Sequence, residues 1–379
     1  MQVLVVGGTF DKERGKASGL INKLSDALIC ELRNYKDSSI DIRNGGNYDE
    51  LLNIMESTPN YDVIFWMANV DNSLPKIRDV KEYAPHSLLV TSKRNDRDEN
   101  GVKKYDMEEL VQRALSVKAN LCIEFSKNDL GKFDMLVFDP LGCLWYEGED
   151  IEKVASSLIN RLIYLNGVTR KGTIRKDDYK FNIEFDNVDR EFLDLVHEYG
   201  ESFHTIMGLP SNVTRFVGNC SLRFKSPTRC MNGFPAIRKG NIILMSRRNV
   251  DKKGISEKDF VPVFEEGDKL LYQGENKPSV DTPVQIRLFE NLPNIDYIIH
   301  GHCYVTGEIP KTLGAVPCGA IEEISEVLSL IDRDYKDRNL DSYIINLKGH
   351  GCLLMCSKKS LDKIKNIEFE ARPLPEKMF

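Results

Sequence analysis

Short apolar segments alternate with amphipathic ones along the first 168 residues. Compact apolar segments bounded by polar residues or glycine are typical of buried strands, and they occupy residues 3–6, 40–43, 63–67, 88–91, 121–125 and 135–138. Apolar residues recur at helical spacing between them, in residues 18–32, 48–56, 107–117 and 151–165. Strands that alternate with helices predict a parallel sheet covered on both faces, so residues 1–168 are expected to form a Rossmann-like or flavodoxin-like α/β domain. The last two predicted strands are close enough in sequence to form a hairpin at one edge.

Polar and glycine-rich positions follow the predicted strands. Ligands of such sheets bind at the carboxyl ends of the strands, where glycine lets a backbone approach an anion and a basic side chain pairs with it. Turn chemistry alone also selects Gly, Asn and Ser, and that alternative stays open. Neither a dinucleotide fingerprint nor a P-loop is present, so the first domain is assigned no function. The residues of this candidate ligand site are Gly7, Gly8, Thr9, Asn44, Ser92, Lys93 and Arg94.

Length and composition set the class of protein. A chain of 379 residues favours two domains, and we expect a linker at 169–188 followed by a second domain at 189–379. The formal net charge of −6 argues against a nucleic-acid partner. No apolar run reaches the roughly 18 residues of a membrane span, so no membrane partner is expected. Nine cysteines without paired spacing predict free thiols in a reducing compartment, hence a cytoplasmic protein.

Three of the six histidines suit a metal ion. His300 and His302 form an H-x-H after an apolar segment, and residues two apart on a strand point to the same face. His350 lies between two glycines, directly after another apolar segment. Three neutral imidazoles with a fourth position open are typical of a catalytic zinc site. Zn²⁺ is the predicted cofactor, with Mn²⁺ or Co²⁺ as alternatives, because imidazole and carboxylate ligands accept several first-row ions.

Ordered motifs place these histidines in a wider pattern. Gly218–Arg223 reads G-N-x-S-x-R, and an apolar strand at 242–246 follows it. Residues 277–283 read K-P-S-V-D-T-P, in which Asp281 precedes His300 by nineteen residues. Val316-Pro317-Cys318 and the turn around His350 come later. In this order the motifs resemble the class II aldolase/adducin family, which includes fuculose-phosphate aldolases and ribulose-phosphate 4-epimerases.

The resemblance implies a class II aldolase-like α/β/α domain in the second half of the chain. It implies a divalent metal held by His300, His302 and His350, and a carboxylate, Asp281, that transfers protons. The implied reaction is retro-aldol cleavage of a phosphorylated or otherwise anionic sugar-like carbonyl substrate. Family members commonly form tetramers, so a homo-oligomer is expected. The positions implied for binding the substrate's anionic group are Asn219, Ser279, Ser246 and Arg248.

Departures from the family pattern leave alternatives open. The family's T-P-S-G turn is replaced by Ser246-Arg247-Arg248-Asn249, and its arginines either bind an anion or face solvent. An aspartate at position 281 resembles the epimerases, so epimerisation or dehydration of a similar sugar phosphate is an alternative reaction. A non-catalytic, adducin-like interaction module is a third. Glu322, Glu323 and Glu326 are expected to form a solvated acidic face of a helix.

Overall fold

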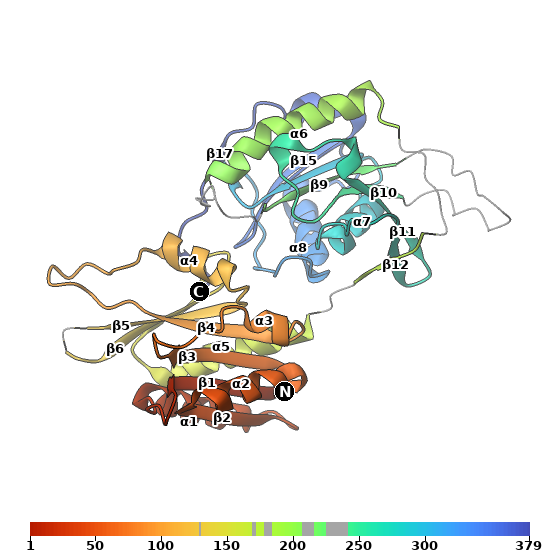
Figure 1. Ribbon diagram of the computed structural model, residues 1–379. Coiled ribbons are helices and arrows are strands. Elements are labelled where there is room, and N and C mark those ends of the chain that lie inside the picture. Colours follow the sequence, from red (N-terminus) through yellow and green to blue (C-terminus); the bar gives the residue numbers. More distant parts are fainter. Residues whose placement is uncertain (129, 169–171, 178–183, 207–215, 225–241) are drawn as a thin grey trace. The chain divides into compact units, whose positions relative to one another are not determined.

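The computed structural model describes residues 1–128, 130–168, 172–177, 184–206, 216–224 and 242–379, and it divides into two compact units (Figure 1). The first unit comprises Met1–Gly167 together with Pro373–Phe379, and the second comprises Val168–Arg372. The sequence placed residues 373–379 with the second domain, but in the structure they return to the first unit. The physical reason is strand pairing, because Glu376 and Lys377 align in parallel with Cys143 and Leu144.

The sheet of the first unit has the strand order β18-β7-β6-β5-β4-β3-β1-β2. Its strands are β1 (Gln2–Asp11), β2 (Ser39–Asn47), β3 (Val63–Val70), β4 (Leu88–Arg94), β5 (Leu121–Lys127), β6 (Phe133–Phe138), β7 (Cys143–Gly148) and β18 (Glu376–Lys377). The strands from β2 to β5 in this order run parallel, and β6 pairs antiparallel with both β5 and β7. The predicted α/β fold is therefore confirmed, and the predicted hairpin is formed by β5 and β6. It is not at the edge of the sheet as expected, because β7 and β18 pair beyond β6.

Helices cover both faces of this sheet. Helices α1 (Gly19–Leu32) and α5 (Ile151–Gly167) pack on the face that contains Val3 and Val5. Helices α2 (Tyr48–Ser57) and α3 (Val80–Tyr83) pack on the opposite face, which contains Leu4 and Val6, and α4 (Met107–Ser116) packs against β5, β6 and β7. Burial of alternate residues on opposite faces explains why Val3–Val6 of β1 are all apolar.

The second unit is built on a mainly antiparallel sheet with the order β15-β16-β13-β9-β10-β11-β12-β8. Its strands are β8 (Thr173–Arg175), β9 (Asn219–Arg223), β10 (Ile243–Ser246), β11 (Phe260–Glu266), β12 (Lys269–Tyr272), β13 (Tyr297–Gly301), β15 (Ser342–Leu347) and β16 (Gly351–Cys356). Only β8 joins in parallel, beside β12, so the segment expected to be a linker contributes an edge strand. A separate pair is formed by β14 (Tyr304–Val305) and β17 (Phe369–Glu370).

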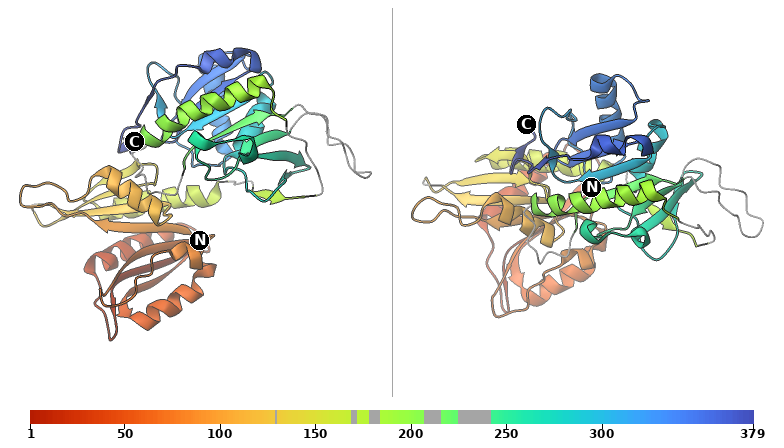
Figure 2. Two further views of the ribbon diagram at one scale, coloured as in Figure 1. Left: turned by 45° about the horizontal axis from the view of Figure 1, so that its top comes forward. Right: turned by 90° about the horizontal axis from the view of Figure 1, so that it is seen from above.

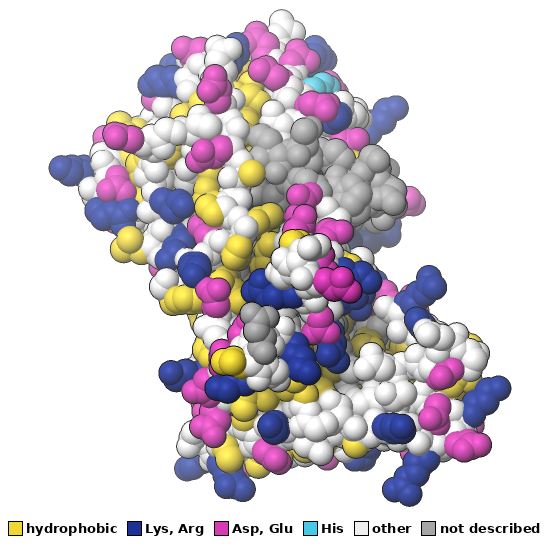
Figure 3. Space-filling view, turned by 90° about the vertical axis from the view of Figure 1, so that its left-hand side faces the viewer, with side chains coloured by type: hydrophobic (Ala, Val, Ile, Leu, Met, Phe, Trp, Pro, Cys, Tyr) yellow, Lys and Arg dark blue, Asp and Glu magenta, His cyan; other side chains and the backbone are white. Residues whose placement is uncertain are grey.

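Helices also cover both faces of the second sheet, which gives the predicted α/β/α layering. Helix α6 (Asn187–Ile206) runs along one face (Figure 2) and shares a core with the short helix η5 (Lys358–Ile364). Helices α7 (Thr282–Asn291) and α8 (Glu322–Leu330) pack on the other face. In the described part of the chain no helix is long and apolar enough to cross a membrane. Acidic and basic side chains are intermingled on the surface drawn in Figure 3.

Lys358 links η5 to the start of α6. Its Nζ lies 2.8 Å from both Asp186 Oδ2 and Asp189 Oδ1. The buried Asp189 also accepts a 2.7 Å hydrogen bond from the hydroxyl of Tyr297, the first residue of β13. This brace therefore connects α6 with the strand that carries His300.

Replacing Lys358 with methionine is expected to lower the free energy of unfolding by about 1–3 kcal/mol, because Asp189 loses a charged hydrogen-bond partner while buried. The hydrogen bond from Lys358 also lowers the pKa of Asp186 below its ordinary value of 3.8. That contribution to stability is present above pH 3.8 and is lost as the pH falls through the lowered pKa. The free energy of unfolding of the variant should therefore fall less on acidification than that of the unaltered protein. Urea unfolding at several pH values tests both points. Lys365→Met, which removes a more exposed ion pair with Glu191, should change little.

Candidate metal centre

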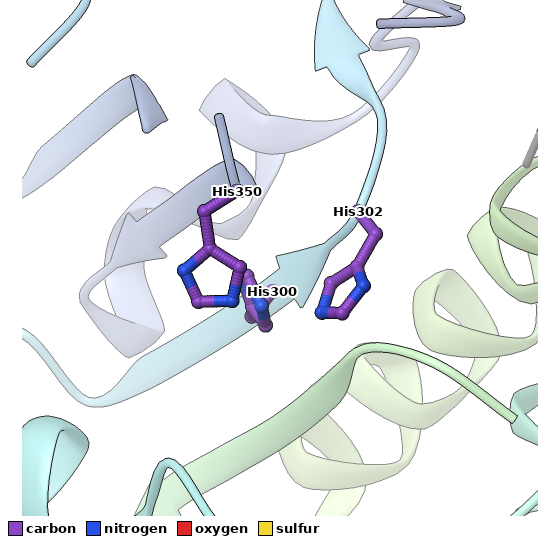
Figure 4. A group of neighbouring side chains, drawn as sticks. All are labelled: His300, His302 and His350. Carbon is purple, nitrogen blue, oxygen red and sulfur yellow. The ribbon is translucent and has the colours of Figure 1, made fainter. Parts of the chain in front are cut away.

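The three predicted histidines converge in the second unit (Figure 4). His300 lies on β13, His302 directly follows that strand, and His350 lies in the turn between β15 and β16. Each side chain is buried, with one ligand atom per residue within 4.8 Å of the others. Pairing of β13 with β16 brings the two segments together. Gly351 is required at this crossing, because a Cβ there would lie 1.9 Å from the Gly301 carbonyl oxygen.

His300 and His302 are held as neutral imidazoles. His300 Nδ1 lies 2.9 Å from the Cys352 carbonyl oxygen, so Nδ1 carries the proton and Nε2 presents a lone pair. Burial, reinforced by the charge of His350, lowers the pKa of His300 to about 4. Burial also lowers the pKa of His302 well below its ordinary value. Among the described residues, His300 Nε2 and His302 Nδ1 have no hydrogen-bond partner. Buried, neutral and partnerless nitrogens fit a metal ion.

His350 differs because both of its nitrogens have partners. Nδ1 lies 2.6 Å from Glu323 Oε2, and Nε2 lies 2.9 Å from Cys318 Sγ. Burial alone would lower the pKa of His350, but Cys318 and Glu323 raise it well above its ordinary value. A carboxylate on the far nitrogen is the usual support of a metal-binding histidine, because it fixes the ring and makes it more basic.

The prediction that Glu323 lies on a solvated acidic face of a helix is wrong, because its side chain is buried. Burial raises the pKa of this carboxyl group, against the opposing effect of His350. Glu323 shares the inward face of α8 with Val327 and Leu330, which follow it by four and seven residues. That helical spacing was the signal in the sequence, since it places one glutamate on the apolar stripe. Glu326, by contrast, binds the backbone of Gly314 at 2.8 Å.

Replacing Glu323 with glutamine should weaken metal binding about 10–100-fold, since the neutral amide no longer makes His350 more basic. Metal affinity is measured by competition with a chromophoric chelator. Glu326→Gln is the matched control, on the same helix and away from the histidines, and it should bind metal as the unaltered protein does. Equal affinities for all three proteins would contradict the role given to Glu323.

Asp281, the predicted proton-transferring residue, lies at the first turn of α7. Aspartate there usually caps the helix, but this side chain makes no capping hydrogen bond. Its Oδ2 accepts a 2.6 Å hydrogen bond from Asn219 Nδ2, and Asn219 Oδ1 accepts one from Gln285, which in turn accepts one from Ser221. Oδ1 is buried and has no partner among the described residues. The charge of Asp281 raises the pKa of His300 against burial, so the carboxylate lies near the histidines.

The predicted anion-binding residues divide into two groups. Ser246, Ser279 and Asn219 are brought together beside Asp281, for Ser279 N donates to Ser246 O at 3.1 Å. The Ser246 hydroxyl accepts from Cys220 N at 3.1 Å. Arg248 is exposed, and its neighbour Arg247 pairs with Asp259 at 2.6 Å. Gln285, Cys318 and Glu323 contact this site and were not among the predicted residues.

The candidate ligand residues of the first unit lie within strands rather than in turns. Gly7, Gly8 and Thr9 belong to β1, and Asn44 lies beside them in β2. Gly8 has a φ of +75°, and a Cβ there would lie 2.6 Å from Gly45 N, so this glycine serves a contact between backbones. Asn44 Oδ1 accepts from Ser18 N at 2.8 Å.

The remaining three candidates lie on β4, which β3 separates from β1. Lys93 lies over the ring of Tyr105, 4.3 Å from its centroid. Arg94 pairs with Asp96 at 2.5 Å. The structure therefore does not bring Ser92, Lys93 and Arg94 next to the glycine segment.

Residues 204–307 match the family model of the class II aldolase and adducin N-terminal domain. The match includes Asn219, Asp281, His300 and His302 and ends before His350. This segment of the second unit is thus similar to that domain, and the resemblance seen in the sequence is confirmed over residues 204–307. Among curated proteins, none matches the chain.

Solved structures similar to this chain share little sequence with it. An L-fuculose 1-phosphate aldolase is 14% identical with a TM-score of 0.29, and the match covers 44% of this chain and 76% of that one. YgbL of Escherichia coli, a proposed aldolase/epimerase/decarboxylase, is 13% identical with a TM-score of 0.29, over 48% and 91%. A DNA/pantothenate metabolism flavoprotein of Streptococcus pneumoniae is 13% identical with a TM-score of 0.33, over 43% and 98%. Similarity at this level identifies no substrate.

Proposed function

We propose that this protein is a metal-dependent lyase that cleaves a carbon–carbon bond of a phosphorylated or otherwise anionic sugar-like carbonyl compound. The observation that carries the proposal is the convergence of three buried imidazoles near the Asp281 carboxylate. Among the residues that the structure describes, two of these imidazoles have a nitrogen without a hydrogen-bond partner, and so has one carboxylate oxygen. The family match over residues 204–307 supports the same class of chemistry.

His300, His302 and His350 would hold the ion, with Zn²⁺ as the first choice and Mn²⁺ or Co²⁺ as alternatives. Bound there, a divalent ion would supply Lewis acidity toward a substrate carbonyl oxygen. The low pKa of His300, about 4, keeps its nitrogen available as a ligand at neutral pH.

Asp281 would provide the proton transfer of a retro-aldol reaction. Asn219 holds Oδ2, so Oδ1 is the atom left to accept the proton of the substrate hydroxyl whose carbon becomes an aldehyde. The buried chain through Asn219 and Gln285 keeps the carboxylate in one orientation, which favours transfer at a defined atom. Ser246 and Ser279 lie beside it and would contact the anionic end of the substrate.

Metal content and product analysis together test the proposal. Mass spectrometry of the purified protein should find about one first-row metal per chain, as expected for a single catalytic site. Incubation with phosphorylated ketoses should then yield two smaller carbonyl fragments. One isomeric or dehydrated product would indicate epimerisation or dehydration instead. No metal, even after resupply of zinc, manganese or cobalt, would contradict the enzyme assignment and favour a non-catalytic interaction module.

A further inference from the structure

Cys318 contacts the one histidine of the cluster that has no free nitrogen. Its Sγ lies 2.9 Å from His350 Nε2, while Nδ1 of the same ring is occupied by Glu323. Nε2 of His350 is therefore the nitrogen that could bind a metal, and the thiol of Cys318 lies within hydrogen-bond distance of it. Thiolate is a strong ligand for the ions that imidazole also binds.

The position of Cys318 is set by its backbone. The next residue, Gly319, has a φ of +73°, and a Cβ there would lie 2.7 Å from the Val280 carbonyl oxygen. Val280 directly precedes Asp281, so this segment is wedged against the loop that carries the carboxylate. Ala320 N donates to Pro317 O at 3.1 Å, which closes a turn around Cys318. The thiol is thus built into the site and is not a surface cysteine that happens to be near it.

Two independent nitrogens point to a ligand at the same place. His300 Nε2 and His302 Nδ1 are buried without partners among the described residues. Their rings lie 4.6 and 5.1 Å from that of His350, between centroids. We propose that Cys318 Sγ is the fourth protein ligand of the resting metal site, an inference that rests on the metal site of the proposed function.

Metal entry would replace one contact by another. The thiol proton leaves to solvent, and a bond from Sγ to the metal replaces the Sγ–Nε2 hydrogen bond. In tetrahedral zinc sites, bonds of about 2.0 Å to nitrogen and 2.3 Å to sulfur separate the two ligand atoms by about 3.5 Å. The observed 2.9 Å must therefore lengthen by several tenths of an ångström. Sγ must also approach His300 and His302, because the ligand atoms that lie within 4.8 Å of one another belong to the three histidines alone among the described residues.

A ligand set of three imidazoles and one thiolate has consequences for the choice of metal and for substrate binding. A thiolate favours Zn²⁺ or Co²⁺ over Mn²⁺ more strongly than imidazole and carboxylate alone. It also leaves Asp281 outside the resting ligand set, as its role in proton transfer requires. Four protein ligands close the site, so a substrate oxygen must displace the thiolate or add as a fifth ligand.

Cobalt substitution of the full-length protein tests the inference without substrate. Co²⁺ added to metal-free protein should produce visible d–d bands together with a near-ultraviolet band from sulfur-to-cobalt charge transfer. Cys318→Ser should retain bound Co²⁺ and the d–d bands but lose the charge-transfer band. Cys303→Ser, at the buried cysteine beside His302, and Cys30→Ser, at an exposed cysteine on α1, should both keep it. In Cys318→Ser the preference for zinc over manganese should also fall.

The outcomes separate this inference from the proposed function. Bound Co²⁺ without a charge-transfer band in the unaltered protein would overturn Cys318 as a ligand and leave the histidine site intact. A band that persists in Cys318→Ser, or disappears in Cys303→Ser, would overturn it as well. Failure of the unaltered protein to bind Co²⁺ at all would overturn the metal site itself.

Discussion

Alanine at position 302 is expected to abolish both metal retention and turnover. His302 is buried, its pKa is lowered by burial, and its Nδ1 has no hydrogen-bond partner among the described residues, as expected of a nitrogen that binds a metal ion. Removing it takes one of the three imidazoles from the ion, which should then be lost on dialysis. Metal content by mass spectrometry and turnover of the best substrate are the two measurements.

A matched substitution distinguishes loss of the site from loss of the fold. His86 is exposed and lies in the first unit, so His86→Ala should keep metal and turnover. Circular dichroism should show the same secondary structure in both variants. If His302→Ala retained one metal per chain, or turned over substrate at the unaltered rate, the three-histidine site would be wrong.

The fold of the first unit was predictable where burial shaped the sequence locally. The apolar segments Val3–Val6 of β1 and Val63–Met67 of β3 are buried on both faces of the sheet, and α1 and α5 carry apolar residues at helical spacing. The four-residue helix α3 and the strands β7 and β18 were missed. A two-residue strand has no pattern of its own, and its pairing with β7 joins parts of the chain that are distant in sequence.

Some residues of the site could likewise be predicted from local patterns, whereas others depend on long-range packing. His300 and His302 followed from the two-residue period of a strand. His350 was chosen for its place between two glycines after an apolar segment, and the order of family motifs supported it. His350 contacts Glu323 at the start of α8 and Cys318 in the segment before that helix. Both contacts depend on how this part of the chain packs against the turn between β15 and β16, which no local pattern specifies. In the first unit the glycines at 7 and 8 were expected in turns, but the structure uses them within a strand, where backbones approach closely.

Substituting asparagine for Asp281 should lower kcat by about 10²–10⁴-fold, the usual contribution of a positioned acid or base. The amide keeps the volume and the contact with Asn219, since its oxygen still accepts the hydrogen bond now made to Oδ2. It cannot take up a proton at the position of Oδ1. Metal content should stay unchanged, and KM should change far less than kcat. Parallel loss of metal and turnover would instead make Asp281 a ligand of the ion, and the proton would then have to pass through another group.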